Sequence, residues 1–292
     1  MGKLVGTLPI TLVLAAITLS FASCRKEGDE DFGKRSIALI SREEGSGTRA
    51  TFVELFGIRE GSSASQGIDM ISEAADITNS SEVMLSAVAG SKGAVGYVSQ
   101  GSLSSSVKAL RVDGTYPSVQ NIKKGSYKMS RPFNVVSKQD AQEAAADFIR
   151  YILSSDGQAV VESSGYIATA SNPRYVATGK QGKVSVVGSS SVAPLMQKLA
   201  MEYQRLCPDV KLEVQPSDST TGINCVVSGV CDIGMASRNL TDSEVALGVS
   251  QAAIAIDGIA VIVNKANPID DVTAEAVRKL FSGHFSTWDQ VH

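Results

Sequence analysis

The sequence predicts an α/β protein, in which the strands of a sheet alternate with helices. Two observations support this fold class. From residue 36 to the end of the chain, short apolar runs typical of buried strands alternate with segments whose apolar residues recur at helical spacing. Several of these runs also end in small, hydroxyl-rich turns that open a helix. The 292 residues suffice for one large domain or two smaller ones.

The first 35 residues have the pattern of an export signal followed by a tether. Leu8–Leu19 is apolar, but it is shorter than the roughly 20 residues that span a membrane comfortably. Residues 1–23 are therefore predicted to be a signal peptide. Phe21–Cys24 resembles a lipoprotein cleavage box, so Cys24 would be lipidated and 24–35 would be a solvated tether. An uncleaved anchor is the alternative, and both interpretations place the rest of the chain outside the cytoplasm.

The alternation begins with a unit of strand, turn and helix. Ile37–Ile40 is a predicted strand, and Ala50–Phe56 is a predicted helix with an apolar face. Residues 58–80 are rich in Ser, Gly and Asp and are predicted to be loop with a short helix. The next predicted strands are 93–98, 107–112 and 132–136, and the next predicted helices are 81–89, 141–154 and 157–164.

A polar segment at 171–183 is predicted to be a linker, after which the alternation starts again. Pro194 suits the first turn of a helix, and Thr273 is a suitable cap for a later one. The predicted strands are 184–187, 210–214, 232–235 and a strand pair over 254–263. The predicted helices are 194–206, 223–228 and 273–281, with a polar turn at 217–222.

The turn Arg42–Arg49 has the composition of an anion site. It lies between a predicted strand and a predicted helix, where backbone N–H groups are unsatisfied and the helix end carries partial positive charge. Arg42 adds a planar, permanently charged fork that fits phosphate or carboxylate. Taken alone, this Gly-Ser-Gly-Thr turn could equally be a helix cap beside a surface ion pair.

Two further turns change that balance, because they share the same character. Ser189–Ser191 and Ser219–Gly222 also follow predicted strands and carry hydroxyl groups. In open α/β sheets, ligands bind beyond the carboxyl ends of the strands, where these turns lie. We therefore expect a polar cage whose dipoles replace the hydration shell of an oxyanion.

Composition argues against several other classes of function. A net charge of −3 disfavours a nucleic-acid surface, and the two histidines, His284 and His292, disfavour a histidine-rich metal site. A serine hydrolase using Ser46 or Ser190 is a weak alternative, since the chain lacks the Gly-x-Ser-x-Gly elbow. The turn also lacks the Gly-Lys-Ser/Thr of a nucleotide P-loop. We expect no metal, no cofactor and no enzyme activity.

Three cysteines follow Cys24 in the chain. An exported protein could pair two of them, as Cys225 with Cys231 or as Cys207 with Cys231, and the sequence does not choose between these pairs.

Four stretches of the chain resemble the PstS-like phosphate-binding proteins of ABC transporters. They are Arg42–Arg49 (REEGSGTR), Gly188–Pro194 (GSSSVAP), Asp232–Arg238 (DIGMASR) and Leu280–Gly283 (LFSG) with Trp288. The resemblance covers nearly all of residues 36–292. It implies a two-lobed periplasmic-binding-protein type II fold with the ligand cleft between the lobes. It also implies capture of inorganic phosphate for an ABC importer, with permease subunits as partners.

The order of these stretches differs from the family's order, in which the GSSS-type turn comes before the REEGSGTR-type turn. Joining 288–292 to 35–40 restores the family's order, so we infer a circular permutation. The thirteen residues 171–183 would connect the family's original ends, and such a segment can span roughly 40 Å. A truncated array or a domain-swapped pair would be alternatives.

This interpretation divides the chain into two lobes that close over the ligand like a hinge. One lobe, here called the split lobe, would be 36–132 plus 258–292. The other, here called the continuous lobe, would be 133–257, including the linker.

The resemblance assigns ligand-binding roles in both lobes. Arg42 would pair with phosphate oxygens, and Glu44 would orient Arg42 without touching the ligand. Hydroxyl and backbone N–H donors would come from Ser46, Gly47, Thr48, Ser190, Ser191 and Ser219.

One departure from the family bears on selectivity. Some members have an Asp where this chain has Ser237, and that carboxylate accepts a phosphate proton that sulfate lacks. The Ser237 hydroxyl can also accept, and Asp218, where relatives often have Gly, is a second candidate. We expect phosphate to be preferred through one of these two residues. Another oxyanion such as sulfate or molybdate, or a binding-protein fold reused as a sensor or adhesin, remains an alternative.

Overall fold

Two long strands pass through both halves of the main sheet and hold it together. This nine-stranded mixed sheet has the order β10-β9-β11-β8-β12-β5-β1-β4, with β6 also paired to β12. β12 (Val249–Asn264) runs antiparallel to β8 (Ser130–Lys138) along its first part and to β5 (Ala94–Ser99) along its second part. The predicted strand pair over 254–263 is therefore wrong, because one continuous strand with a bulge near Ala253 replaces it.

The computed structural model describes residue 2, residues 31–61 and residues 67–291. The predicted signal peptide, Cys24 and residues 24–30 of the predicted tether lie outside these described residues. Within the described residues, no helix is both long and apolar enough to cross a membrane.

The remaining strands complete the two halves of the sheet and form two small sheets beside it. β9 pairs in parallel with β10 and β11, and β1 pairs in parallel with β4 and β5. Besides β5, β8 and β12, the strands of the main sheet are β1 (Ala38–Arg42), β4 (Asp76–Thr78), β6 (Val107–Ala109), β9 (Gly182–Ser189), β10 (Val210–Ser217) and β11 (Ile233–Ala236). The small sheets pair β2 (Arg59–Glu60) with β3 (Ile68–Asp69), and β7 (Arg111–Val112) with β13 (Asp271–Val272).

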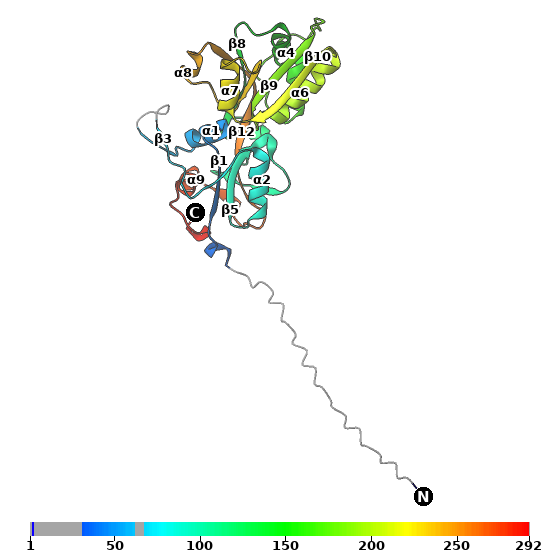
Figure 1. Cartoon of the computed structure of the whole chain (residues 1–292). Coiled ribbons are helices and arrows are strands. Elements are labelled where there is room, and N and C mark those ends of the chain that lie inside the picture. Colours follow the sequence, from blue (N-terminus) through cyan, green and yellow to red (C-terminus); the bar gives the residue numbers. More distant parts are fainter. Residues whose placement is uncertain (1, 3–30, 62–66, 292) are drawn as a thin grey trace. The chain divides into compact units, whose positions relative to one another are not determined.

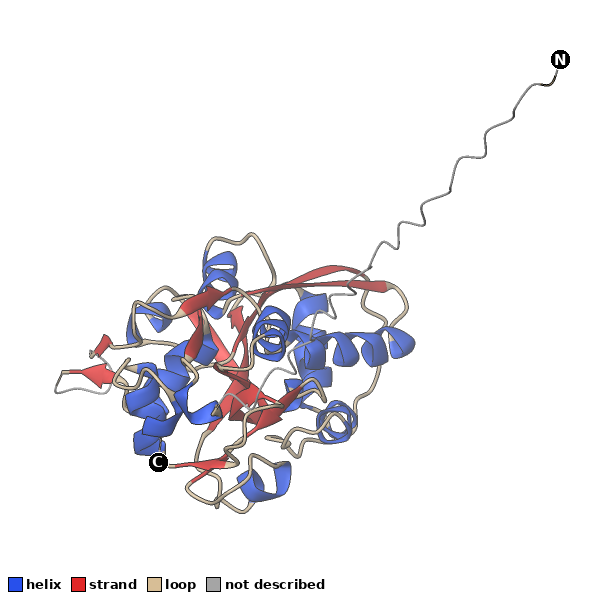
Figure 2. Cartoon of the chain, turned by 90° about the horizontal axis from the view of Figure 1, so that it is seen from below, coloured by secondary structure: helices blue, strands red, loops and turns tan. Residues whose placement is uncertain are grey.

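Helices lie on both sides of the strands (Figure 2). The α-helices are α1 (Gly47–Leu55), α2 (Ser81–Gly90), α3 (Val119–Lys123), α4 (Glu143–Leu153), α5 (Ser155–Ser163), α6 (Ala193–Leu206), α7 (Ser219–Val227), α8 (Asp242–Val245) and α9 (Ala274–Phe281). Short 3-10 helices are η1 (Phe32–Lys34), η2 (Gln100–Ser102) and η3 (Trp288–Gln290).

The buried core has two parts. Apolar clusters within 133–255 fill the upper, green-to-yellow half of Figure 1, around β8, β9 and α6. Separate clusters from 39–129 and 259–291 fill the lower half, where Phe52 stacks on Tyr97 with ring centroids 3.9 Å apart. We keep the names continuous lobe and split lobe for these two parts.

The first and last described segments meet in the split lobe. Phe32 lies 6.2 Å from the Trp288 ring, and the Trp288 N–H donates to the Arg35 carbonyl at 3.3 Å. Residues 31–35 thus belong to the folded unit, which corrects the predicted end of the tether at residue 35. The reason is that Phe32 packs against an indole contributed by the far end of the chain.

Several other predicted boundaries also need correction. The predicted strand 107–112 is two short strands with different partners, β6 with β12 and β7 with β13. The predicted turn 217–222 contains the first turn of α7, because Asp218 caps that helix by accepting the Thr221 N–H at 2.8 Å. The last two residues of the predicted linker are in β9. Among the described residues of 58–80 there are short strands and no helix.

Neither of the two possible disulfides is present, and Cys207, Cys225 and Cys231 are all free thiols. Cys207 is buried with its sulfur 3.2 Å from the Tyr175 hydroxyl. Burial raises the pKa of Cys231 to about 12, so this thiol stays protonated and donates to the Ile233 carbonyl.

Candidate functional site

The hydroxyl-rich turns of the two lobes meet at one buried place. Arg42 Nη2 donates to Ser190 Oγ at 3.2 Å, and a hydrogen bond of 2.8 Å joins Thr48 Oγ1 to Ser191 Oγ. Ser191 Oγ also lies 3.3 Å from Ser81 Oγ. All five side chains are buried, although 190 and 191 belong to the continuous lobe and the other three to the split lobe. We call this group, together with the residues placed beside it below, the serine cage.

The split lobe contributes a strand end and the helix start that follows it. Arg42 is the last residue of β1, and Ser46 caps α1 by accepting the Arg49 N–H at 3.3 Å. Gly47 and Thr48 therefore occupy the first turn of α1, where backbone N–H groups have no partner within the helix. The partial positive charge of this helix end points into the cage.

The continuous lobe contributes three segments that meet at Ser237, just after β11. The Ser237 N–H donates to Ser219 Oγ at 3.0 Å, and Ser189 Oγ donates to Ser237 Oγ at 3.0 Å. Ser219 begins α7 and Ser189 ends β9, and all three side chains are at most 3% exposed. A buried hydroxyl needs a hydrogen-bond partner, and here the serines satisfy one another.

At Gly47 the backbone of one lobe lies close against side chains of the other. A Cβ added at Gly47 would lie 2.4 Å from Ser219 Oγ and 2.7 Å from Ser237 Oγ. The backbone of α1 therefore faces these hydroxyls directly, and no larger residue fits without separating the lobes.

Glu43, not Glu44, orients the arginine of the cage. Arg42 Nε and Nη2 donate to the two carboxylate oxygens of Glu43 at 2.8 and 2.7 Å. Glu44 is exposed, so the role predicted for it is wrong. Arg42 ends β1, and Glu43 follows it directly in the chain. The two parallel hydrogen bonds to the Glu43 carboxylate fix the plane of the guanidinium group. Arg42 Nη2 also donates to Ser190, so the guanidinium contacts both the partly exposed Glu43 and the interior of the cage.

Asp218 lies at the rim of the cage, with both carboxylate oxygens engaged. Its Oδ1 accepts the Thr221 N–H at 2.8 Å, and its Oδ2 accepts the Thr221 hydroxyl at 2.5 Å. A Cβ at Gly45 would lie 2.4 Å from Asp218 Oδ1, so this cap also faces the turn before α1. Ser237, in contrast, lies inside the cage.

Two features of this site were not predicted from the sequence. Ser81 begins α2 after β4 and follows Ser80, so it repeats the strand, hydroxyl turn and helix pattern that identified the other turns. The second feature is a buried ion pair between Arg131 and Asp257. Arg131 also contacts the cage, because its Nη1 donates to the Ser237 carbonyl at 3.2 Å. Nothing in the sequence indicates this pair, because it depends on the register of β8 against β12.

Burial sets the ionisation of the groups beneath the cage. It lowers the pKa of Arg131 and raises the pKa of Asp257, while each partner's charge opposes the shift of the other. Burial also raises the pKa of Tyr97 to about 12, so its hydroxyl stays neutral and accepts the Arg42 N–H at 3.1 Å.

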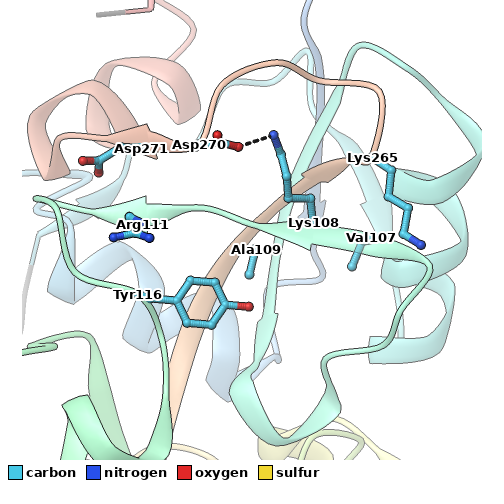
Figure 3. A pocket seen from close by; sticks show the side chains of 8 residues that line it. All are labelled: Val107, Lys108, Ala109, Arg111, Tyr116, Lys265, Asp270 and Asp271. Carbon is cyan, nitrogen blue, oxygen red and sulfur yellow. Dashed lines mark hydrogen bonds and ion pairs between the residues drawn. The ribbon is translucent and has the colours of Figure 1, made fainter.

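A separate recess of about 810 Å³ lies on the split lobe and contains none of the predicted site residues (Figure 3). Its charged groups include Lys108, whose Nζ donates to Asp270 Oδ1 at 2.7 Å, and Arg111. No group of three or more possible metal ligands occurs anywhere in the described part of the chain.

The sequence is similar to known families of binding proteins. The PBP superfamily domain matches residues 26–156 and 175–292. The phosphate-binding protein PstS 2 of Streptococcus agalactiae is 47% identical over 271 residues, which cover 92% of both chains. The chain belongs to the PstS family.

A solved structure from this family confirms the predicted two-lobed α/β periplasmic-binding fold. It is the phosphate-binding protein of a phosphate ABC transporter from Streptococcus pneumoniae TIGR4, with a TM-score of 0.69 and 41% identity. The match covers 88% of this chain and all of that chain. The PstS protein of Pseudomonas aeruginosa matches over a shorter range, with 36% identity over 118 residues, or 38% of this chain and 36% of the relative.

The contact at Gly47 gives a test of the closed arrangement. Gly47→Ala should lower the free energy of unfolding by about 1–3 kcal/mol, because the added methyl group overpacks the Ser219 and Ser237 hydroxyls. Gly90→Ala is the matched control, since this helical glycine has nothing within 4 Å of an added Cβ. In urea denaturation, the free energy of unfolding of Gly90→Ala should equal that of wild type or exceed it by about 0.5–1 kcal/mol. Equal stability of the two variants would mean that α1 and the serine turns do not meet.

Proposed function

We propose that this PstS family member binds inorganic phosphate outside the cytoplasm and delivers it to the permease subunits of an ABC importer. The observation that carries the proposal is the serine cage, in which buried donors from both lobes converge around one arginine. The similar streptococcal proteins are phosphate-binding proteins by name, which gives independent support.

The chemistry of the cage suits a tetrahedral oxyanion. Arg42 supplies the positive charge, and the first turn of α1 supplies N–H groups from Gly47 and Thr48. Hydroxyls that now bond to one another, such as those of Thr48 and Ser191, can rotate to donate to anion oxygens instead. The complete proposed set is Arg42, Ser46, Gly47, Thr48, Ser190, Ser191, Ser219 and Ser237, with Ser81 added from the structure.

The same geometry favours binding without chemistry. A serine nucleophile needs a general base, and the cage offers hydroxyls, amides and a permanently protonated guanidinium. Among the described residues the single histidine, His284, is exposed in the loop after α9. We therefore expect no hydrolysis of phosphate esters.

We propose Ser237 as the residue that recognises a protonated phosphate oxygen. Its hydroxyl lies inside the cage, whereas both oxygens of Asp218 already accept hydrogen bonds from Thr221. Ser237 Oγ accepts a hydrogen bond from Ser189 and lies 3.4 Å from Ser219 Oγ, so one lone pair can still accept a hydrogen bond from a P–OH group of the ligand.

Export and anchoring remain proposals from the sequence. We propose that residues 1–23 are removed, that Cys24 carries the lipid, and that the tether ends at residue 30, just before the folded unit begins at Asp31. A tether of this kind would hold the protein near the permease.

We also propose that the chain is a circular permutant of the common PstS order. The ends of the folded unit are adjacent, since the Ile37 N–H donates to the Ser286 carbonyl at 3.0 Å and Ser36 bridges Thr287. If the chain is permuted, an alignment that keeps residue order can match it to only part of a relative with the common order. The match to the Pseudomonas protein, which covers 38% of this chain, fits this expectation. The streptococcal relatives, matched over most of their length, would share the permuted order.

Calorimetric titration with phosphate tests the main proposal. The wild-type chain should bind one phosphate, and Arg42→Ala should weaken binding by about 2–5 kcal/mol, because a desolvated cation loses its anion partner. Arg278→Ala removes an exposed arginine of the split lobe and should bind like wild type. Absence of phosphate binding by the wild-type chain would reject the proposal and favour a sensor or adhesin.

Competition between phosphate and sulfate tests the selectivity. Phosphate should displace sulfate, because sulfate has no proton for Ser237 to accept. Ser237→Ala should lower the affinity for phosphate more than the affinity for sulfate, and so reduce the preference for phosphate. Equal affinity of the wild-type chain for both anions would contradict this role for Ser237.

A rejoined chain tests the permutation. Residues 182–292 followed by 31–176 would restore the order of the common family while retaining the Tyr175 hydrogen bond to Asp147. This chain should fold and bind phosphate as tightly as the original, since the cut and the joint both fall outside the cage. A rejoined chain that unfolds, while wild type does not, would show that the ends are not interchangeable.

A further inference from the structure

A buried ion pair crosses the two strands that connect the lobes. Arg131 in β8 and Asp257 in β12 are register partners, and their side chains are 1% and 0% exposed. Both guanidinium contacts to Asp257 Oδ2 measure 3.4 Å. The pair lies where β12 changes partner from β8 to β5, which is the position of a hinge between the lobes.

The pair is connected to both lobes. Asp257 Oδ1 accepts the Ser99 hydroxyl at 2.8 Å and the Gly101 N–H at 3.3 Å, both from the split lobe. Arg131 Nη1 donates to the carbonyl of Ser237, a cage residue of the continuous lobe.

The Ser237 carbonyl has a second donor from across the cleft. Thr51 Oγ1, on α1 of the split lobe, lies 3.4 Å from the same oxygen. Because α1 also carries Gly47 and Thr48, the position of the Ser237 turn is tied both to the hinge strands and to the helix that would hold the anion.

Stability alone does not explain a pair of this kind. Desolvating two charges is costly, and replacing a buried ion pair with uncharged residues is often neutral or stabilising. The contacts of 3.4 Å are also longer than the 2.7–2.8 Å contacts between Arg42 and Glu43, so Arg131 is shared between Asp257 and the Ser237 carbonyl. A group with divided contacts of this kind can respond to movement of either lobe.

We infer that Arg131 and Asp257 are positioning residues that fix the Ser237 turn when the lobes close, and so couple anion binding to closure. The inference rests on the proposed phosphate-binding function. Neither residue needs to touch the anion, because the pair acts through the Ser237 backbone. An open arrangement would carry Thr51 away from Ser237 and leave Arg131 as the remaining donor to the Ser237 carbonyl.

The test neutralises both charges together, so that no unpaired charge remains buried. In Arg131→Met with Asp257→Asn, the amide oxygen at 257 can still accept from Ser99 and Gly101, while the donor to Ser237 is lost. The matched control is Arg278→Met with Glu275→Gln, which removes an exposed ion pair of α9. Stopped-flow release of phosphate, small-angle scattering at saturating phosphate and thermal unfolding are measured on both.

The double variant should fold, release phosphate about tenfold faster than wild type, and show a larger radius of gyration at saturating phosphate. The control should match wild type in all three measurements. A double variant that folds and keeps both the wild-type release rate and the wild-type scattering would overturn the inference while leaving phosphate binding intact. If the double variant fails to fold, Arg131→Lys, which keeps the charge but loses the divided fork, must release phosphate faster, or the inference is wrong. A wild-type chain that binds no phosphate would overturn the proposed function and this inference with it.

Discussion

The hydrogen bonds that cross between the lobes are the contacts on which the rest of the structure depends. Arg42 reaches Ser190, and Thr48 reaches Ser191, although these partners are more than 140 residues apart in sequence. Each hydrogen bond adds little net stability by itself. Its donor and acceptor are buried, however, and leaving either one buried without a partner would cost more free energy than the bond contributes. When the lobes separate, these groups exchange their partners for water, and when an anion binds they exchange them for its oxygens, so the cost of either exchange is small.

Charge in the cage is arranged in two layers. The first layer is Arg42, which is buried, pairs with a partly exposed Glu43 and donates to Ser190 inside the cage. The second is Arg131, fully buried and balanced by Asp257, so it adds little net charge but holds the Ser237 turn. Two guanidinium groups so near one another repel, and the charge of Arg42 adds to the effect of burial in lowering the pKa of Arg131. A bound dianion would relieve part of this repulsion.

The sequence predicted the parts of the site that local turn chemistry determines. The turns at Ser46–Thr48, Ser189–Ser191 and Ser219 lie together as expected, because each follows a strand of the same sheet and opens a helix. What sequence could not predict depends on register or on choices between neighbours. Glu43, and not the predicted Glu44, pairs with Arg42, because the backbone direction after β1 decides which of the two carboxylates faces the guanidinium group. Arg131 meets Asp257 because β8 and β12 align at those positions. The length of β12 was underestimated because its first part includes the polar residues Ser250 and Gln251, which nevertheless pair with β8.

The most direct test of the account is diffraction from crystals grown with arsenate, a tetrahedral analogue of phosphate whose arsenic gives an anomalous signal. The account predicts one strong anomalous peak, enclosed by Arg42, Thr48 and Ser190, with the lobes closed around it. A peak elsewhere, or closed lobes with no peak in the cage at saturating arsenate, would contradict it.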